Sequence, residues 1–394
     1  MIIKNALIFD AVSDDPFLGD VLTAGGKIAR VIRKEWESEP DAGTLAEYGK
    51  DGVIDAGGMR VYPGLVDAHS HIGLDGHGGS TGGTQDYNEY NDPVTPQLRG
   101  MDSYNPRDGA IPAALAGGVT TVCTGPGSSN VIGGTATVVK LVGNTLDDAL
   151  LIPEAAMKCA FGENPKRCYK DRSNSARMST AAKLREALFS ARDYMLRKEA
   201  AGGEITKMPK FDMKAESLMR VLKGELPLKA HAHRADDIMT AIRIAKEFGV
   251  AVTVEHCTEG NLIKDELKAA GVRVAVGPTL SNVSKPELIN KSWTTPGVLA
   301  SAGIPVSIIT DAPVIPQEYL PLCAGLAVKA GMNERDALRA ITINAARHIG
   351  ADGRVGSLEE GKDADIVIAS GNILHSESEV ITVIVNGKVA YRKD

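Results

Sequence analysis

The chain has 394 residues, of which 43% are hydrophobic, and a formal net charge of -6 at pH 7. This length suffices for one large domain and a smaller one, each with a filled core. The negative charge and the 4% share of aromatic residues argue against a general affinity for nucleic acid or a platform that stacks bases.

No run of eighteen uncharged apolar residues occurs, and the N-terminal residues lack the layout of a secretion signal. We therefore expect a cytoplasmic protein that acts on a small molecule, without a membrane or nucleic-acid partner; homo-oligomer formation is left open. The five cysteines lack any Cys-x-x-Cys spacing, which fits reduced thiols better than a disulfide framework or a zinc ribbon. They are Cys123, Cys159, Cys168, Cys257 and Cys323.

Both ends of the chain predict short β-strands. Near the N-terminus these strands cover residues 2–9, 20–22, 27–32 and 53–54, and near the C-terminus they cover 365–369, 380–385 and 388–391. Strands of this kind need a partner sheet, which the other end of the chain can supply. We predict a small composite β-sandwich domain built from residues 1–60 and 351–394.

Between these ends, residues 61–350 alternate short β-branched strands with helical stretches, which is typical of a parallel βα architecture. Strands are predicted at about 65–71, 120–124, 135–141, 156–161, 228–232, 251–256, 273–277 and 304–310. Eight strands in about 290 residues predict an α/β fold, a distorted TIM (β/α)8 barrel with insertions, whose chemistry lies at the C-terminal strand ends.

Two stretches are too long for ordinary connections. Residues 73–108 form a polar loop that includes Gly76-His77-Gly78-Gly79, and loops of such length are more often functional than idle. Residues 162–225 carry a basic run and a predicted helix at 180–200. This second insertion is interpreted either as a solvated amphipathic helix with a charged turn, or as a lid that lends a cation to an anionic substrate group.

The first barrel strand ends in the most informative pattern of the chain. Apolar Leu65 and Val66 lead into Asp67, and His69 and His71 follow with one residue between them. Residues i and i+2 of a strand share a face, so the two imidazoles would converge just beyond the strand. Two neutral imidazoles are half of a transition-metal site, although ordinary strand histidines also occur in this spacing.

Later strand ends carry further polar side chains. His231 and His233 again share one face, and His256 ends the sixth predicted strand. Asp311 follows an apolar strand, where a carboxylate is costly unless it is paired or faces a cleft. Lys158 lies within an apolar strand, where burial would lower the pKa of its amine; a snorkelling or ion-paired lysine is the alternative.

The run from Asp55 to His71 resembles, almost residue for residue, the first barrel strand of the amidohydrolase superfamily. Residues 361–367 and 385–389 are similar to the closing strands of its composite domain. Ala230-His231-Ala232, Glu255-His256 and residues 118–121 resemble the imidazolonepropionase-related and prolidase-like branch. The resemblance covers the whole chain.

The resemblance implies one or two divalent ions, with zinc expected, and a carbamylated lysine that can bridge them. Asp311 would be the general base, His256 a metal ligand or a hydrogen-bond donor to the substrate carbonyl, and His233 a substrate contact or support. Lys140 is a lower-ranked rival for the bridging role of Lys158. The implied metal ligands are His69, His71, Lys158, His231, His256 and Asp311.

The function implied is metal-dependent hydrolysis of a C–N bond in an amide, peptide-like or cyclic amide substrate. One alternative is an aminohydrolase that deaminates a small heterocycle, which would add a glutamate near the fifth strand. A catalytically silent scaffold is a second alternative, but it would have lost metal ligands. His348 is expected to cap the last barrel helix and His375 to lie in a surface turn, and residues 161–165 depart from the Gly-rich ending expected after a bridging lysine.

Overall fold

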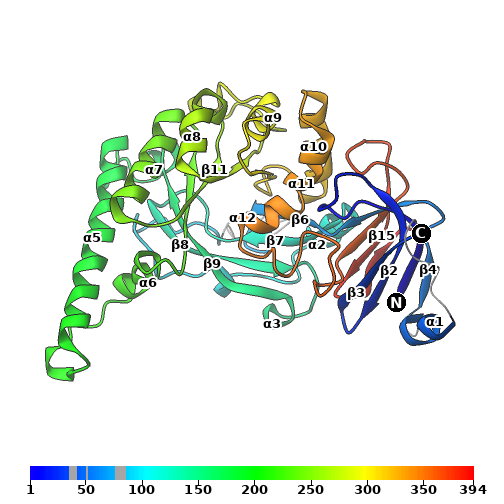
Figure 1. Cartoon of the computed structure of the whole chain (residues 1–394). Coiled ribbons are helices and arrows are strands. Elements are labelled where there is room, and N and C mark those ends of the chain that lie inside the picture. Colours follow the sequence, from blue (N-terminus) through cyan, green and yellow to red (C-terminus); the bar gives the residue numbers. More distant parts are fainter. Residues whose placement is uncertain (35–41, 50–51, 76–85) are drawn as a thin grey trace.

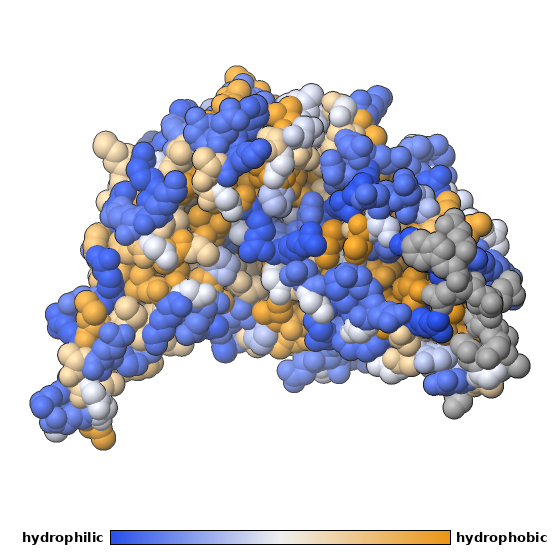
Figure 2. All heavy atoms as spheres, viewed as in Figure 1, coloured by the Kyte–Doolittle hydropathy of each residue, from blue (hydrophilic) through white to orange (hydrophobic). Residues whose placement is uncertain are grey.

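The computed structural model describes residues 1–34, 42–49, 52–75 and 86–394. The chain forms a barrel flanked by helices and, beside it, a β-sheet in which both termini lie (Figure 1). The predicted Gly76-His77-Gly78-Gly79 loop lies outside the described residues. Hydrophilic side chains cover most of the face seen in Figure 2, with apolar side chains scattered between them, as is normal for a protein surface.

The terminal sheet has eight strands from the two ends of the chain. Its order is β16-β15-β14-β5-β1-β2-β3, with β4 paired to β1. The strands are β1 (Ile2–Ile8), β2 (Phe17–Ala24), β3 (Lys27–Arg33), β4 (Val53–Asp55), β5 (Arg60–Pro63), β14 (Ile366–Ala369), β15 (Val380–Val385) and β16 (Lys388–Arg392). The antiparallel pair β5–β14 joins the two halves. Helix α1 (Ala42–Tyr48) precedes β4.

This sheet folds back so that the start of β3 meets the segment before β14. Lys27, at the start of β3, forms an antiparallel bridge with Asp363, just ahead of β14, and the Ala364 amide donates to the Gly26 carbonyl at 2.9 Å. Ile3, Ile28 and Ile384 are among the buried residues that fill the space between. The prediction of a separate β-domain made by both termini is confirmed, and its strands belong to one continuous sheet.

The second sheet forms a nearly closed barrel whose eight strands follow one another in chain order. They are β6 (Leu65–Ser70), β7 (Val119–Thr124), β8 (Ile132–Lys140), β9 (Leu150–Ala160), β10 (Leu228–Ala232), β11 (Val252–His256), β12 (Arg273–Val276) and β13 (Val306–Ile308). The backbone amide of Asp311 donates to the His69 carbonyl at 3.2 Å, which brings the end of the last strand beside the first. The predicted distorted TIM barrel is confirmed.

Helices connect and cover these strands. They are α2 (Ile111–Ala116), α3 (Leu146–Ala149), α4 (Glu163–Cys168), α5 (Arg177–Ala201), α6 (Met213–Leu222), α7 (Ala235–Phe248), α8 (Lys264–Ala270), α9 (Thr294–Ser301), α10 (Leu320–Lys329), α11 (Glu334–Ala340) and α12 (Ile343–His348). The helix predicted at 180–200 is α5, whose lower end projects away from the barrel (Figure 1). Among the described residues, no helix is both long and apolar enough to cross a membrane.

Strand β10 shows how the sequence positions site residues. Leu228, Ala230 and Ala232 pack in the core cluster that also contains residues of α7. The intervening Lys229 points the other way, because its Nζ donates to Glu255 Oε2 at 2.7 Å. The two-residue period of a strand therefore places His231, two residues after Lys229, on this second face.

Strand β8 runs antiparallel to both β7 and β9, which corrects the expectation of an all-parallel barrel. A parallel crossover needs about a dozen residues or more, usually with a helix. Residues 125–131 are too few for one, and residues 141–149 hold only the short helix α3. Because β8 is reversed, its last residue, Lys140, lies opposite Thr121 near the start of β7.

Lys140 therefore points towards the terminal sheet, and the interpretation of Lys140 as a bridging lysine is wrong. Its Nζ lies 2.7 Å from Asp363 Oδ2 and 3.0 Å from Asp365, and donates to Asn386 Oδ1 at 2.5 Å. The ammonium compensates two buried carboxylates where the barrel meets the terminal sheet.

We predict that Lys140→Met lowers the free energy of unfolding by about 3–5 kcal/mol, because it removes the cation paired with the buried Asp365, whereas Asp363 keeps Lys27 and Arg354. Urea unfolding followed by circular dichroism measures this change. The exposed Lys207, which pairs with Glu204, provides the control Lys207→Met, with an expected loss of at most about 1 kcal/mol. Equal effects of the two substitutions would contradict a stabilising role for the buried network.

Candidate active site

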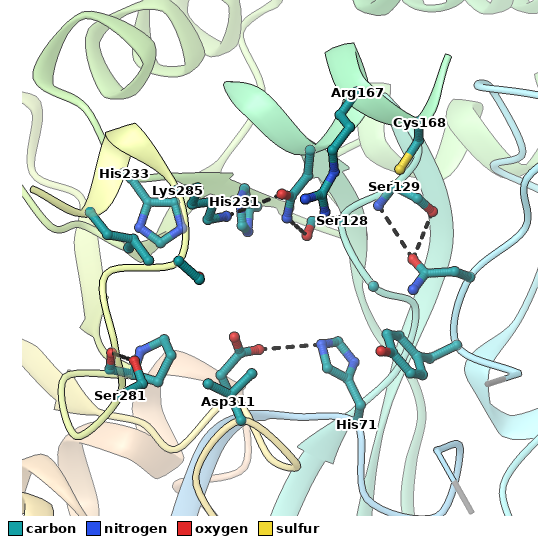
Figure 3. A pocket seen from close by; sticks show the side chains of 18 of the residues that line it. His71, Ser128, Ser129, Arg167, Cys168, His231, His233, Ser281, Lys285 and Asp311 are labelled. Carbon is teal, nitrogen blue, oxygen red and sulfur yellow. Dashed lines mark hydrogen bonds and ion pairs between the residues drawn. The ribbon is translucent and has the colours of Figure 1, made fainter. Parts of the chain in front are cut away.

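A cavity of about 560 Å³ opens at the C-terminal ends of the barrel strands. His71 and Asp311 lie on one side of it and His231 and His233 on the other (Figure 3). This is the end of a TIM barrel at which the chemistry of the fold takes place. The structure thus brings together side chains from segments far apart in the sequence.

The His69-Ser70-His71 segment meets the segment that follows β13. Asp311 Oδ1 lies 3.4 Å from His69 Nε2 and 3.3 Å from His71 Nε2. Asp311 has a φ of +54°, which is uncommon for a residue other than glycine and costs conformational energy. Backbone strain of this kind is concentrated at functional sites, where the surrounding structure holds it in place.

Three histidines of the site, His69, His71 and His256, each have their Nδ1 within hydrogen-bond distance of a carboxylate or backbone carbonyl oxygen. His69 Nδ1 lies 2.9 Å from Glu255 Oε2, His71 Nδ1 lies 2.8 Å from the Gly125 carbonyl and His256 Nδ1 lies 2.8 Å from the Gly277 carbonyl. Because a carbonyl or carboxylate accepts, we assign the proton to Nδ1 in each ring. The Nε2 lone pairs then face the site.

The second group of histidines comes from β10 and β11. One ligand atom each of His231, His233 and His256 lies within 4.8 Å of the others, and the same holds for His69, His256 and Asp311. His256 thus belongs to both groups. Val254 packs in the core cluster on the helix side of the sheet. Strand alternation would place the His256 side chain on that same face, but a φ of +71° at His256 breaks the alternation.

Several polar atoms in these groups have no hydrogen-bond partner in the part of the chain that the structure describes. Neither ring nitrogen of His231 forms a hydrogen bond with the described residues, nor does His256 Nε2, although both side chains are buried. Burial lowers the pKa of His256 to about 4 and the pKa of His231 well below its usual value, so both rings are neutral at pH 7. Buried nitrogen lone pairs that converge near a carboxylate form a cation-binding set, and the residues present therefore fit a divalent metal ion.

Lys158 extends from β9 into the same site. Its Nζ is 3.1 Å from His69 Nε2, and no carboxylate of the described residues lies within 4 Å of it. The side chain is buried, and this burial lowers the pKa of Lys158 to about 8. A larger share of this lysine is therefore neutral amine than at the surface.

Glu255 lies at the base of the site and was not among the predicted site residues. Its carboxylate accepts from Lys229 Nζ at 2.7 Å and also contacts His69 Nδ1 and His348 Nε2, the latter at 2.7 Å. Burial opposes ionisation, but Lys229 and His348 reverse this effect and hold the pKa of Glu255 well below its usual value. The sequence contains a signal for this role: the two-residue alternation of side chains along β10 and β11 places Lys229 and Glu255 on the inner face of the barrel.

His348 was expected to cap the last barrel helix, and this expectation is wrong. It is the final residue of α12, but its buried ring faces Glu255 inside the barrel. His375 lies near Glu334 and Glu377 with its side chain 53% exposed, in agreement with the predicted surface turn.

Asp67 is a second supporting carboxylate that was not among the predicted site residues. Its Oδ2 accepts from Thr310 Oγ1 at 2.5 Å and from Gln317 Nε2 at 2.6 Å, and its Oδ1 accepts from the His69 amide at 3.1 Å. Burial raises the pKa of Asp67 to about 7. These contacts tie β6 to the segment that carries Asp311.

Both predicted insertions contribute to the cavity wall. The first provides Tyr87, whose ring stacks on His71 with a centroid distance of 4.8 Å. The second provides Asn164 and Arg167, whereas α5 and α6 do not line the cavity. The second insertion therefore combines a segment at the cavity with a helical pair outside it.

A sequence profile of the amidohydrolase family matches residues 60–390. The crystal structure of an amidohydrolase from Thermotoga maritima is 40% identical, with a TM-score of 0.92, and the alignment covers 100% of both chains.

Two curated proteins extend this likeness. Amidohydrolase tasK of Hapsidospora irregularis is 27% identical over 99% of this chain and 43% of its own length. The imidazolonepropionase of Thermoplasma volcanium is 42% identical over 20% of each protein. The matched regions thus span less than half the length of these two relatives. By its sequence profile and its full-length structural match, the chain belongs to the amidohydrolase family.

Proposed function

We propose that this protein is a metal-dependent hydrolase that cleaves a C–N bond in an amide, peptide-like or cyclic amide substrate of small size. One observation carries the proposal: buried Nε2 atoms of His69, His71 and His256 converge with the Asp311 carboxylate beside an open cavity. Family membership supports a hydrolase that acts on C–N bonds.

The donor set suits zinc, which prefers imidazole nitrogen and carboxylate oxygen. His69, His71 and Asp311 would form one part of the site, and His231 and His256 the other. A divalent ion held there would polarise the substrate carbonyl and lower the pKa of water to about 7.

The side chains of this chain then have separate tasks. Asp311 accepts the proton of the attacking water and passes it to the leaving nitrogen. His233, which lines the cavity, can receive a hydrogen bond at Nδ1 from Thr258 Oγ1, 2.8 Å away. Its Nε2–H is then free to donate to the oxyanion that forms from the substrate carbonyl.

Lys158 lies where an anionic bridge between two ions would be needed. Its neutral amine can add carbon dioxide, forming a carbamate and releasing one proton. Its burial, its lack of a carboxylate partner among the described residues and its distance of 3.1 Å from His69 Nε2 support this role. A carbamate would favour two ions, and an unmodified lysine would favour one.

The aminohydrolase alternative receives less support from the cavity. It would need a glutamate that faces the substrate, and no glutamate belongs to the described residues that line the cavity. Glu287, 3.9 Å from His233 Nε2, is buried beside Lys285 and accepts from the backbone amide of Glu163. Its carboxylate is already paired.

Metal content gives the first test. Protein purified without chelator should contain about one or two divalent ions per chain by elemental analysis. His231→Ala should reduce this number, because it removes a buried nitrogen donor, whereas the exposed His375→Ala serves as the control. A folded native protein without metal would exclude the mechanism.

Asp311→Asn should reduce kcat by at least about 100-fold, because an amide cannot accept the proton, while most metal stays bound. Turnover is measured on the best substrate from a screen of N-acyl amino acids, dipeptides, hydantoins and lactams. Asp171→Asn, at an exposed position, is the matched control. Near-normal turnover of the Asp311 variant would remove Asp311 as the base.

The carbamate has its own test. Metal-free protein reconstituted with zinc under carbon dioxide-free conditions should show low activity that recovers when bicarbonate is added. Lys158→Ala should not respond to bicarbonate, because it lacks the amine. Indifference of the wild-type protein to bicarbonate would indicate an ordinary lysine.

A further inference from the structure

Two cationic side chains on the cavity wall differ in their partners. Lys285 Nζ lies 2.8 Å from Glu287 Oε1 and donates to Asn164 Oδ1 at 3.2 Å, so its charge is balanced within the protein. Arg167 has no carboxylate within 4 Å among the described residues, and it extends from α4 towards the open cavity (Figure 3). Within the part of the chain that the structure describes, Arg167 is thus a cation on the cavity wall without a paired carboxylate.

The backbone that carries Arg167 is held firmly. The Glu163 amide, at the start of α4, donates to Glu287 Oε2 at 2.9 Å. Gly162 has a φ of +82°, and a Cβ there would lie only 2.3 Å from the same oxygen, so only glycine fits. Residues 161–165 differ from the Gly-rich ending that was expected after a bridging lysine. In the structure these residues hold the start of α4 against the buried carboxylate of Glu287.

Neutral polar side chains line the cavity together with Arg167. Asn164 Nδ2 donates to Ser128 Oγ at 2.7 Å, and both residues line the cavity with Arg167. Asp311, across the cavity, is the one carboxylate among the described residues of the lining. An anionic substrate group would be repelled by Asp311 and attracted by Arg167, which orients the substrate across the cavity.

We propose that Arg167 binds a carboxylate of the substrate, so that the substrate is a small amide that carries a carboxylate, such as an N-acyl amino acid or a dipeptide; this inference rests on the proposed C–N hydrolysis. A guanidinium pairs with a carboxylate through two parallel hydrogen bonds. One unpaired cation balances a monoanion, whereas a phosphate monoester carries a charge of about -1.5 to -2 and would stay partly uncompensated. A cavity of about 560 Å³ accommodates ligands of this size.

The test uses N-acetyl-L-amino acids, each compared with its uncharged C-terminal amide, on the metal-loaded full-length protein. Acetate release gives kcat/KM, and calorimetry gives the affinity for each acid. The wild type should prefer the acid by about 10- to 100-fold, which is the loss expected for a hydrogen bond to a charged group. Arg167→Gln should abolish this preference, because it should lower kcat/KM for the acids far more than for the uncharged amides.

Two variants control for charge and for position. Arg167→Lys retains the charge but not the paired geometry, and it should recover part of the preference. Lys170→Gln removes an exposed cation from the same insertion that does not line the cavity, and it should leave the preference unchanged.

The outcomes separate this inference from the proposed function. A preference that survives Arg167→Gln, or an equal loss for acids and amides, would overturn the role of Arg167. Wild-type hydrolysis of the uncharged amides at least as fast as of the acids would overturn it too, and would leave C–N hydrolysis intact. Arg167-dependent binding of the acids without acetate release would support the carboxylate subsite and count against hydrolysis.

Discussion

The site depends on one electrostatic constraint: nitrogen lone pairs and a carboxylate face the same point. His71 and His256 donate their Nδ1 protons to backbone carbonyls, and each Nε2 is turned inward. Asp311 Oδ1 then lies 3.3 Å from His71 Nε2, an arrangement of two electron-rich atoms that a cation would stabilise. The folded protein therefore produces a negative electrostatic potential at this point, which favours the binding of a cation.

Hydrogen bonds to the buried carboxylates of Glu255 and Asp67 maintain this arrangement. Glu255 fixes the ring of His69, Lys229 balances the charge of Glu255, and His348 donates a hydrogen bond to Glu255. Asp67 joins the first strand to Thr310, the residue before Asp311. Partners of this kind orient the side chains that face a metal and set which ring nitrogen carries the proton.

The two insertions form part of the cavity wall, whereas His231 and His233 at the end of β10 also line the cavity. Tyr87 packs on His71 from one side, and α4 presents Arg167 from the other. Function in a TIM barrel is varied through the loops after the strands, because the strands themselves are fixed by packing.

The amino-acid sequence by itself determined the barrel, the β-domain made by both termini and the strand ends that carry His69, His71, His231, His256 and Asp311. These features depend on local patterns: a two-residue period, apolar strands and polar residues directly after them.

Only the tertiary structure decided the direction of β8, and with it the place of Lys140 near Asp363. It also decided that His348 faces Glu255 and that Arg167 lacks a carboxylate partner among the described residues. These facts depend on which distant segments meet, and on the backbone angle at His256, and neither is encoded in a local period. Charge balance within a folded core is a property of neighbours in space, so it becomes visible only when the chain has closed on itself.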